Sequence, residues 1–291
     1  MNLAVLCRAT RSYSLPASVV PVLLGTVLAG RGYGSIDEGH FDLRTFVLVL
    51  LGAILAHFGA NVLNDYFDFV KGVDTRPEHG SGVLTRGEMT PAQALGLAAI
   101  FFLGAGLCAV FLLRGHFIVV VSLGSIGLAC AVLYPAFLKK YGLGDLLIIL
   151  AFGLGITIGA YGVQVSNVSR QAWWMIALYS MPICLLVDAI LHANNLRDAP
   201  DDRAAHVRTL ATLVSPEAGR AWQLVLLFGP LAFVLAGVAT EFLPVWSLGT
   251  MLAFPLLLGA ARSGSVPGTA QAHLVFGLLY TGCFLLKPVF I

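Results

Sequence analysis

Nine apolar stretches, most of them long enough to cross a bilayer as a helix, follow one another along this chain of 291 residues. A membrane-spanning helix needs about 20 mostly apolar residues. Only 11% of the residues are charged, whereas a soluble domain carries about a quarter, so too few charges are present to cover a water-facing surface. The sequence therefore predicts an all-α membrane protein that crosses the lipid bilayer many times. The expected spans are residues 14–29, 46–63, 92–113, 117–136, 143–165, 173–192, 219–240, 245–261 and 272–290.

Short polar segments separate the stretches, and none is long enough to divide two domains, so residues 1–291 are interpreted as a single domain. Of the 17 Lys and Arg residues, 12 fall at the N-terminus or in the loops after the second, fourth, sixth and eighth stretches. Positively charged loops stay on the cytoplasmic side of a membrane, so these loops are predicted to face the cytoplasm. The net charge of +2, without a basic tail, gives no indication of nucleic acid binding.

Acidic residues gather on this same predicted cytoplasmic side, although they contribute little to topology. A first cluster begins where the second stretch ends. If the helix continues by a turn, Asn61, Asn64, Asp65 and Asp68 share one face, because they are spaced by three and four residues. This cluster contains Asn61, Asn64, Asp65, Asp68, Lys71 and Asp74.

A second cluster of similar design begins where the sixth stretch ends, and Pro200 is expected to bend or end the helix there. Carboxylates at such spacings repel one another, and a divalent cation removes that repulsion. Carboxylate and amide oxygens suit Mg²⁺, which usually shares its shell with a phosphate. With the nearby basic side chains, the two clusters predict a site for a diphosphate chelated by Mg²⁺. The second cluster and its basic neighbours are Asn194, Asn195, Arg197, Asp198, Asp201, Asp202, Arg203 and Arg208.

A third polar segment follows the fourth stretch and contains Tyr134, Lys139 and Lys140. One interpretation is a positively charged cytoplasmic loop with an interfacial tyrosine. The other gives Lys139 or Lys140 to the phosphates and Tyr134 to the wall of the pocket. Both interpretations remain open from the sequence.

A diphosphate with a long isoprenoid tail is the kind that needs a membrane enzyme. Its tail partitions into an apolar site, because burying each methylene lowers the free energy by about 0.8 kcal/mol. Mg²⁺ and cationic side chains stabilise a leaving diphosphate. The allylic cation left behind is stabilised by aromatic side chains and must be kept from water. The partners predicted here are a polyprenyl diphosphate and a lipophilic aromatic acceptor.

The motifs resemble those of the UbiA superfamily of intramembrane prenyltransferases over nearly the whole chain. The resemblance lies in Asn64-Asp65-x-x-Asp68 with Asp74, and in Asp198-x-x-x-Asp202. It implies a helical bundle around a central cavity with Mg²⁺ between the motifs. Further stretches are similar to the 1,4-dihydroxy-2-naphthoate polyprenyltransferases of menaquinone synthesis, in which a ring carbon is prenylated and CO₂ is lost. These stretches are residues 11–18, 64–75, 142–145, 161–164 and 192–198.

The resemblance also implies roles for individual residues. Asn64, Asp65, Asp68, Asp198 and Asp202 are expected to bind Mg²⁺ and diphosphate, with the four aspartates as the catalytic set. Lys71, Arg197 and Arg208 are expected to meet phosphate oxygens, and Gln164 to line the cavity. The pattern departs from the branch at His206, where Lys is usual, and at Asp188, where a small or hydroxyl residue is common. Asp188 is therefore either a functional acid or a half-exposed residue near the cavity mouth.

His57 lies inside the second apolar stretch. His57 is expected to make a hydrogen bond between helices rather than to act in catalysis. The rival functions are transfer to another acceptor (4-hydroxybenzoate, homogentisate, haem or a sugar phosphate), a membrane transporter, and an inactive lipid-binding homologue. Transport predicts acids near the middle of the bilayer and broken helices, whereas here the acids gather at one face.

Overall fold

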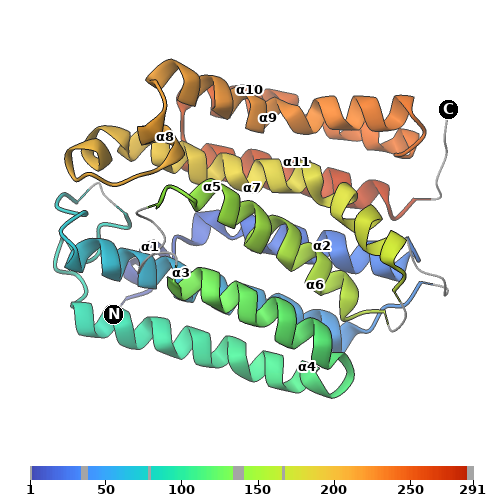
Figure 1. The fold of residues 1–291 in the computed structure, drawn as a ribbon, viewed down its shortest axis with the longest axis horizontal. Coiled ribbons are helices and arrows are strands. Elements are labelled where there is room, and N and C mark those ends of the chain that lie inside the picture. Colours follow the sequence, from blue (N-terminus) through green and yellow to red (C-terminus); the bar gives the residue numbers. More distant parts are fainter. Residues whose placement is uncertain (1, 34–38, 78–79, 134–140, 166–167, 287–291) are drawn as a thin grey trace.

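The computed structural model describes residues 2–33, 39–77, 80–133, 141–165 and 168–286 as a bundle of long helices lying side by side (Figure 1). The short helix α1 and the last turns of α11 lie at opposite ends of this bundle. The elements are α1 (Leu3–Ala9), η1 (Ser12–Ser14), α2 (Pro16–Gly30), α3 (Leu43–Val70), α4 (Pro91–Leu133), α5 (Gly144–Ile148), η4 (Ile149–Gly155), α6 (Ile156–Gly162), α7 (Arg170–Ala204), α8 (Leu210–Leu213), α9 (Pro216–Ala239), η5 (Val245–Ala253), α10 (Phe254–Ser263) and α11 (Val266–Cys283).

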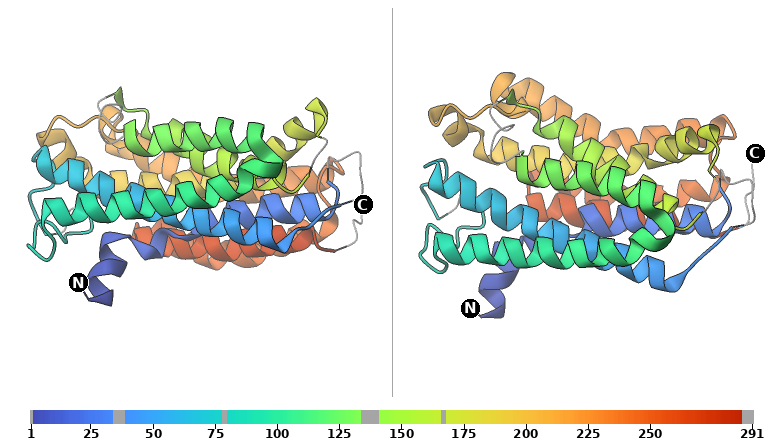
Figure 2. Two further views of the ribbon diagram at one scale, coloured as in Figure 1. Left: turned by 90° about the horizontal axis from the view of Figure 1, so that it is seen from below. Right: turned by 60° about the horizontal axis from the view of Figure 1, so that its bottom comes forward.

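Seven helical segments of the described chain are long and apolar enough to cross a membrane. One of them, α4, has 43 residues and would measure about 65 Å if straight, roughly twice the hydrocarbon thickness of a bilayer. Its backbone leaves the helical conformation at His116, and the chain turns back there (Figures 1 and 2). With α4 counted as two passes and α11 added, the described residues hold nine passes. The predicted all-α bundle of about nine spans is confirmed.

The helices α3 and α7 extend well beyond the apolar stretches that predicted them. Their 28 and 35 residues replace the expected spans 46–63 and 173–192, and the added turns carry Asn64, Asp65 and Asp68 on α3 and residues 194–203 on α7. Pro200 does not end α7, which continues to Ala204. Most members of each cluster therefore project from one helix at helical spacing.

The last helix begins earlier than expected. The prediction was a span over 272–290, whereas α11 starts at Val266 because Ser265 caps it, accepting a hydrogen bond from Gly268 N, and a proline follows in the first turn. Serine caps and first-turn prolines set helix starts independently of apolarity.

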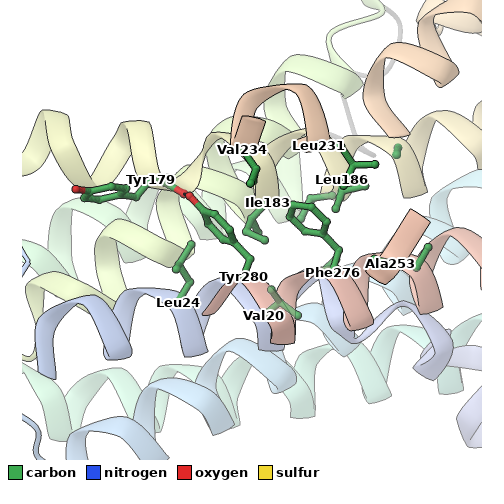
Figure 3. Close-up of a cluster of buried hydrophobic side chains, with 14 of the residues drawn as sticks. Val20, Leu24, Tyr179, Ile183, Leu186, Leu231, Val234, Ala253, Phe276 and Tyr280 are labelled. Atoms are coloured by element: carbon green, nitrogen blue, oxygen red, sulfur yellow. The ribbon is translucent and has the colours of Figure 1, made fainter. Parts of the chain in front are cut away.

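The largest apolar core lies between α2, α7, α9, η5 and α11 (Figure 3). Val20 and Leu24 from α2, Ile183 from α7 and Phe276 and Tyr280 from α11 are all fully buried there. A smaller cluster joins α1, α3 and α4. The helix α7 thus runs from the densest part of the bundle to the polar cluster at its C-terminal end.

Candidate active site

A cavity of about 160 Å³ opens between the C-terminal ends of α3 and α7, where both polar clusters lie. Apolar residues of α5 and η4, including Ile148 and Phe152, form part of its wall. Its polar lining consists of Arg11, Asn61, Asn64, Asp68, Asp74, Asn194, Asn195, Asp198, Asp201 and Asp202. The two clusters that the sequence places far apart therefore face one space.

On α3, Asn64 and Asp68 face the cavity one helical turn apart. Asn64 Nδ2 donates to Asp68 Oδ2 over 2.9 Å. This bond orients the amide so that its oxygen, together with the carboxylate, remains on the cavity side as a donor set of the kind that hard cations use.

Asp65 has a different environment from Asp68, although it belongs to the same motif. Its Oδ1 forms an ion pair with Arg11, and its Oδ2 accepts a hydrogen bond from Ser81 N over 3.1 Å. Asp65 is not among the residues that line the cavity. Its carboxylate thus joins α3 to the segment before α2 and to the loop before α4.

Arg11 lines the cavity and is held in an unusual backbone conformation. Its φ of 48° lies in the left-handed region, which is rare for a residue with a side chain and tends to occur at functional sites. Burial alone would lower the pKa of Arg11, but Asp65 and nearby Asp74 raise that pKa above its ordinary value. Its Nε has no hydrogen-bond partner within the described chain. Arg11 therefore offers a permanent positive charge and an unused donor beside the cavity.

The cluster on α7 repeats the arrangement on α3. Asn194 Nδ2 donates to Asp198 Oδ2 over 3.1 Å, again one turn apart. Arg197 donates to both oxygens of Asp198, from Nε over 2.7 Å and from Nη2 over 2.8 Å. Arg197 itself is not part of the cavity lining. It therefore neutralises and orients Asp198 from outside the cavity.

Asn195 provides a donor that no protein group uses. Its side chain is buried, it lines the cavity, and its Nδ2 has no partner among the described residues. A buried amide without a partner costs free energy, and a phosphate oxygen in the cavity would satisfy it.

The donor set fits Mg²⁺ shared with a phosphate group better than a metal held by protein alone. Within the part of the chain that the structure describes, no three His, Cys, Asp or Glu side chains are close enough to hold a metal ion. Mg²⁺ usually takes one or two carboxylates and completes its shell with water and phosphate oxygens. Asp68 on α3 and Asp198 and Asp202 on α7 can serve in this way from opposite walls.

Several predicted site residues lie away from the cavity. Gln164 is a correction: its amide hydrogen-bonds with the backbone N and O of Asp42 over 2.8 and 3.1 Å, which places it at the opposite end of α3. Lys71 lies over the ring of Phe67, and Arg208 is exposed. Neither lines the cavity. Tyr134, Lys139 and Lys140 lie outside the described residues.

Sequence reasoning missed Arg11, Asp201 and Phe152 as lining residues with a role in the site. Arg11 pairs with a residue 54 positions away, so no local spacing signals the contact. Phe152 lies on the π-helical segment η4, inside an apolar run that has no polar residue to mark it. Asp201 belonged to a recognised cluster, where only its neighbours were chosen.

A second, apolar cavity of about 450 Å³ lies between α3, α4 and the η4–α6 segment. Ala131 and Ala151 line both cavities, which therefore meet. A ligand with a polar head and an apolar tail could occupy both.

His57 makes the hydrogen bonds that the sequence predicted. Its Nε2 lies 2.9 Å from Ser14 Oγ and its Nδ1 lies 2.8 Å from Ser18 Oγ. Both nitrogens of this buried ring are used between helices, which confirms the structural interpretation.

The chain matches the model of the UbiA prenyltransferase family over residues 18–288. The UbiA prenyltransferase domain-containing protein 1 homolog of Drosophila melanogaster is 31% identical over 298 residues, covering 96% of this chain and 79% of that protein. UbiA prenyltransferase domain-containing protein 1 of Homo sapiens is 31% identical over 292 residues, covering 96% of this chain and 83% of that protein.

Solved structures share the fold. A UbiA homolog from Aeropyrum pernix K1, in its apo form, gives a TM-score of 0.68 at 18% identity, covering 94% of this chain and 97% of that one. A UbiA homolog from Archaeoglobus fulgidus bound to GPP and Mg²⁺ gives 0.64 at 12% identity, covering 97% and 98%.

Proposed function

We propose, given that this chain belongs to the UbiA prenyltransferase family and is an integral membrane prenyltransferase, that it transfers a polyprenyl group to an aromatic acceptor with the help of Mg²⁺. The observation that carries the proposal is that both polar clusters line one cavity, which meets a larger apolar cavity. A prenyl diphosphate fits this pair of spaces, with its head between α3 and α7 and its chain among α3, α4 and α6. The donor is thus a polyprenyl diphosphate.

The transfer breaks the bond between the allylic carbon and the diphosphate oxygen, and the electron pair leaves with the diphosphate. A ring carbon of the acceptor then forms a new bond to the allylic cation. Bound Mg²⁺ neutralises charge on the leaving diphosphate. In this arrangement Arg11 and Asn195 donate hydrogen bonds to diphosphate oxygens, and Phe152 offers an aromatic face to the cation.

The finer proposal for the acceptor is 1,4-dihydroxy-2-naphthoate, as in menaquinone synthesis. Its support is the similarity of five stretches of the sequence to polyprenyltransferases that use this acceptor. In this reaction the ring carbon bearing the carboxylate is prenylated. The bond to the carboxylate then breaks, CO₂ leaves, and its electron pair restores the aromatic ring. The proposed site faces the cytoplasm, because described basic residues of the predicted cytoplasmic loops, such as Arg76 beside Asp201, lie at the cavity end.

The test uses the full chain purified in detergent with labelled geranylgeranyl diphosphate, Mg²⁺ and a panel of aromatic acceptors. Asp68→Asn and Asp198→Asn are compared with the wild type. Glu217→Gln is the matched control, because Glu217 is exposed and pairs only with Arg220 among the described ion pairs. We expect prenylated naphthoate from wild type and control, and a loss of about 100-fold or more in both cavity variants.

Different outcomes separate the parts of the proposal. Removal of Mg²⁺ with EDTA should abolish transfer. Product with another acceptor would keep the mechanism and overturn the naphthoate proposal. Failure to transfer to any acceptor, with diphosphate binding unaltered by either cavity substitution, would overturn the assigned site.

A further inference from the structure

Three titratable side chains with no part in the proposed transfer meet behind the wall of the polar cavity. Asp145 lies on α5, and Asp188 and His192 lie on α7, where both are fully buried. His192 Nδ1 is 3.0 Å from Asp145 Oδ1, and its Nε2 is 3.0 Å from the carbonyl oxygen of Gly219 on α9. This acid–histidine cluster (Asp145, Asp188 and His192) therefore joins three helices.

Asp188 lies one helical turn before His192 on α7, so its carboxyl shares a helix face with the ring that contacts Asp145, and the Asp145 charge acts on it. Yet neither oxygen of Asp188, nor Oδ2 of Asp145, meets an N–H or O–H donor anywhere in the described chain. Two ionised carboxylates have no proton to share and repel each other. The pair must therefore carry a proton of its own.

Counting donors fixes the charge of the whole cluster. The carbonyl of Gly219 can only accept, so His192 Nε2 carries a hydrogen. If Nδ1 also carries one, imidazolium pairs with the Asp145 carboxylate. If Nδ1 is bare, it accepts the proton of a neutral Asp145. In both cases Asp188 is a neutral acid that donates to Asp145, and the cluster has no net charge.

This neutrality agrees with its surroundings. An uncompensated charge buried among helices is costly. No group of three such side chains in the described residues is arranged to bind a metal. The sequence-based alternative that Asp188 is half-exposed is wrong, because it is completely buried.

The cluster lies directly behind residues that form the cavity. Gly144 and Leu191, the chain neighbours of Asp145 and His192, both line it, and so does Asn195, one turn beyond His192. The acid–histidine cluster does not line the cavity itself. It can influence the site only by holding α7 against α5 at the level where α7 presents Asn195 and Asp198.

We infer that Asp145, Asp188 and His192 are positioning residues, a neutral proton-sharing lock that sets how α7 presents Asn195 and Asp198 to the diphosphate. This inference rests on the proposed function. It assigns Asp188 the role of hydrogen-bond donor to Asp145 and gives it no proton transfer in the reaction.

The experiment compares two replacements of Asp188. In Asp188→Asn an amide N–H replaces the acid O–H, so the bond to Asp145 is kept without a titratable proton. In Asp188→Leu the donor is lost and Asp145 is left unpaired. Tyr280→Phe is the matched control, since it removes a buried hydrogen bond to the backbone of α7 at Tyr179 (Tyr280 Oη to Tyr179 O, 3.1 Å) far from the cavity.

For each protein, the Kd of geranylgeranyl diphosphate with Mg²⁺, kcat and the unfolding midpoint are measured. We expect Asp188→Asn to stay close to wild type in Kd and kcat. Asp188→Leu should raise Kd by about 10-fold or more, the usual range when a residue that orients a ligand group is lost. Tyr280→Phe should lower only the unfolding midpoint. Asp188→Ala serves as a smaller replacement if Asp188→Leu does not fold.

Infrared difference spectroscopy gives a readout that no folding defect imitates. Wild type at neutral pH should show the C=O stretch of a protonated carboxylic acid, and Asp188→Asn should lose the part of that band that Asp188 contributes. Absence of that band from wild type would overturn the shared proton.

Three binding results would overturn the positioning role. One is an Asp188→Leu protein with lowered stability but normal Kd, which indicates a purely structural cluster. Another is an Asp188→Asn protein that binds normally but loses kcat, which indicates proton transfer. A wild type that binds no prenyl diphosphate would overturn the proposed function, and the positioning role with it.

Discussion

Asp65 and Asp68 lie three residues apart on α3, yet their carboxylates have different partners. Asp68 faces the cavity with Asn64. Asp65 faces Arg11 and Ser81 N. The Arg11 and Asp65 side chains are only 13% and 6% exposed, so their ion pair is shielded from solvent and salt. Breaking one half of such a pair leaves a buried charge alone.

We therefore expect Arg11→Gln to lower the free energy of unfolding by about 3 kcal/mol, because removing one partner strands the other. The double variant with Asp65→Asn should recover part of this loss, since no charge is then left unpaired. Denaturant unfolding in detergent micelles measures both. Arg220→Gln is the control: its pair with Glu217 is 66% and 76% exposed, and we expect a loss of at most about 1 kcal/mol. Equal losses in Arg11→Gln and the double variant would contradict the buried pair.

At this scale, the sequence located residues whose role depends on local spacing. Asn64, Asp68, Asn195, Asp198 and Asp202 all line the cavity, because spacings of three and four residues on a helix keep side chains on one face. The sequence did not locate contacts between distant segments. Two such contacts are the ion pair of Arg11 with Asp65 and the hydrogen bonds of Gln164 with the Asp42 backbone. Both depend on how the helices pack, which the spacing of residues in the sequence does not indicate.

Among the helices, α2 and α6 approach so closely that a glycine is needed between them. A Cβ on Gly25 would lie 2.2 Å from the backbone oxygen of Thr157 and 3.0 Å from Ala160 Cβ. In membranes, helices associate through small residues that let their backbones approach. Since the nearest atom belongs to the backbone, a side chain at position 25 cannot be accommodated by a simple rotamer change.

Two glycine replacements should accordingly have opposite effects. Gly25→Ala should lower the unfolding free energy by about 1–3 kcal/mol through overpacking. Gly96→Ala, on α4 with nothing within 4 Å of the added Cβ, should raise it by about 0.5–1 kcal/mol, because alanine loses less backbone entropy in a helix. Unfolding curves recorded in the same detergent compare them. Two neutral replacements would mean that the α2–α6 contact is looser than the structure indicates.

The sequence predicted which segments form helices better than it predicted the residues at which those helices end. Apolarity reports where lipid surrounds the chain, so it located all nine passes. It does not report where a helix stops: α3 continues through its polar motif to Val70, and α7 passes Pro200. The two passes inside α4 were predicted separately as 92–113 and 117–136, which agrees with the turn at His116.

Across the described residues, the odd number of passes places α1 and the end of α11 on opposite sides of the membrane. The end that carries the cavity is joined by ion pairs between distant segments. Arg8 on α1 meets Glu88 at 2.6 Å, and Arg76 meets Asp201 on α7 at 3.6 Å. The N-terminal helix, the loop before α4 and the end of α7 therefore belong to one face, which we propose is cytoplasmic.

Cysteine labelling tests this orientation with a residue the chain already has. Cys7 on α1 is the one cysteine of the five that is exposed, and its neighbour Arg8 pairs with Glu88 in the loop before α4. A membrane-impermeant thiol reagent should therefore label it only after the cells are permeabilised. In a Cys7→Ser background, Arg44→Cys, at the exposed start of α3 on the other side, should be labelled in intact cells. Cys130 lines the cavity and is a second target for the reagent. Labelling of the Cys7→Ser protein without Arg44→Cys therefore measures the background from Cys130. Labelling of Cys7 in intact cells, with Arg44→Cys protected, would place the site on the outer face, where a cytoplasmic supply of prenyl diphosphate could not reach it.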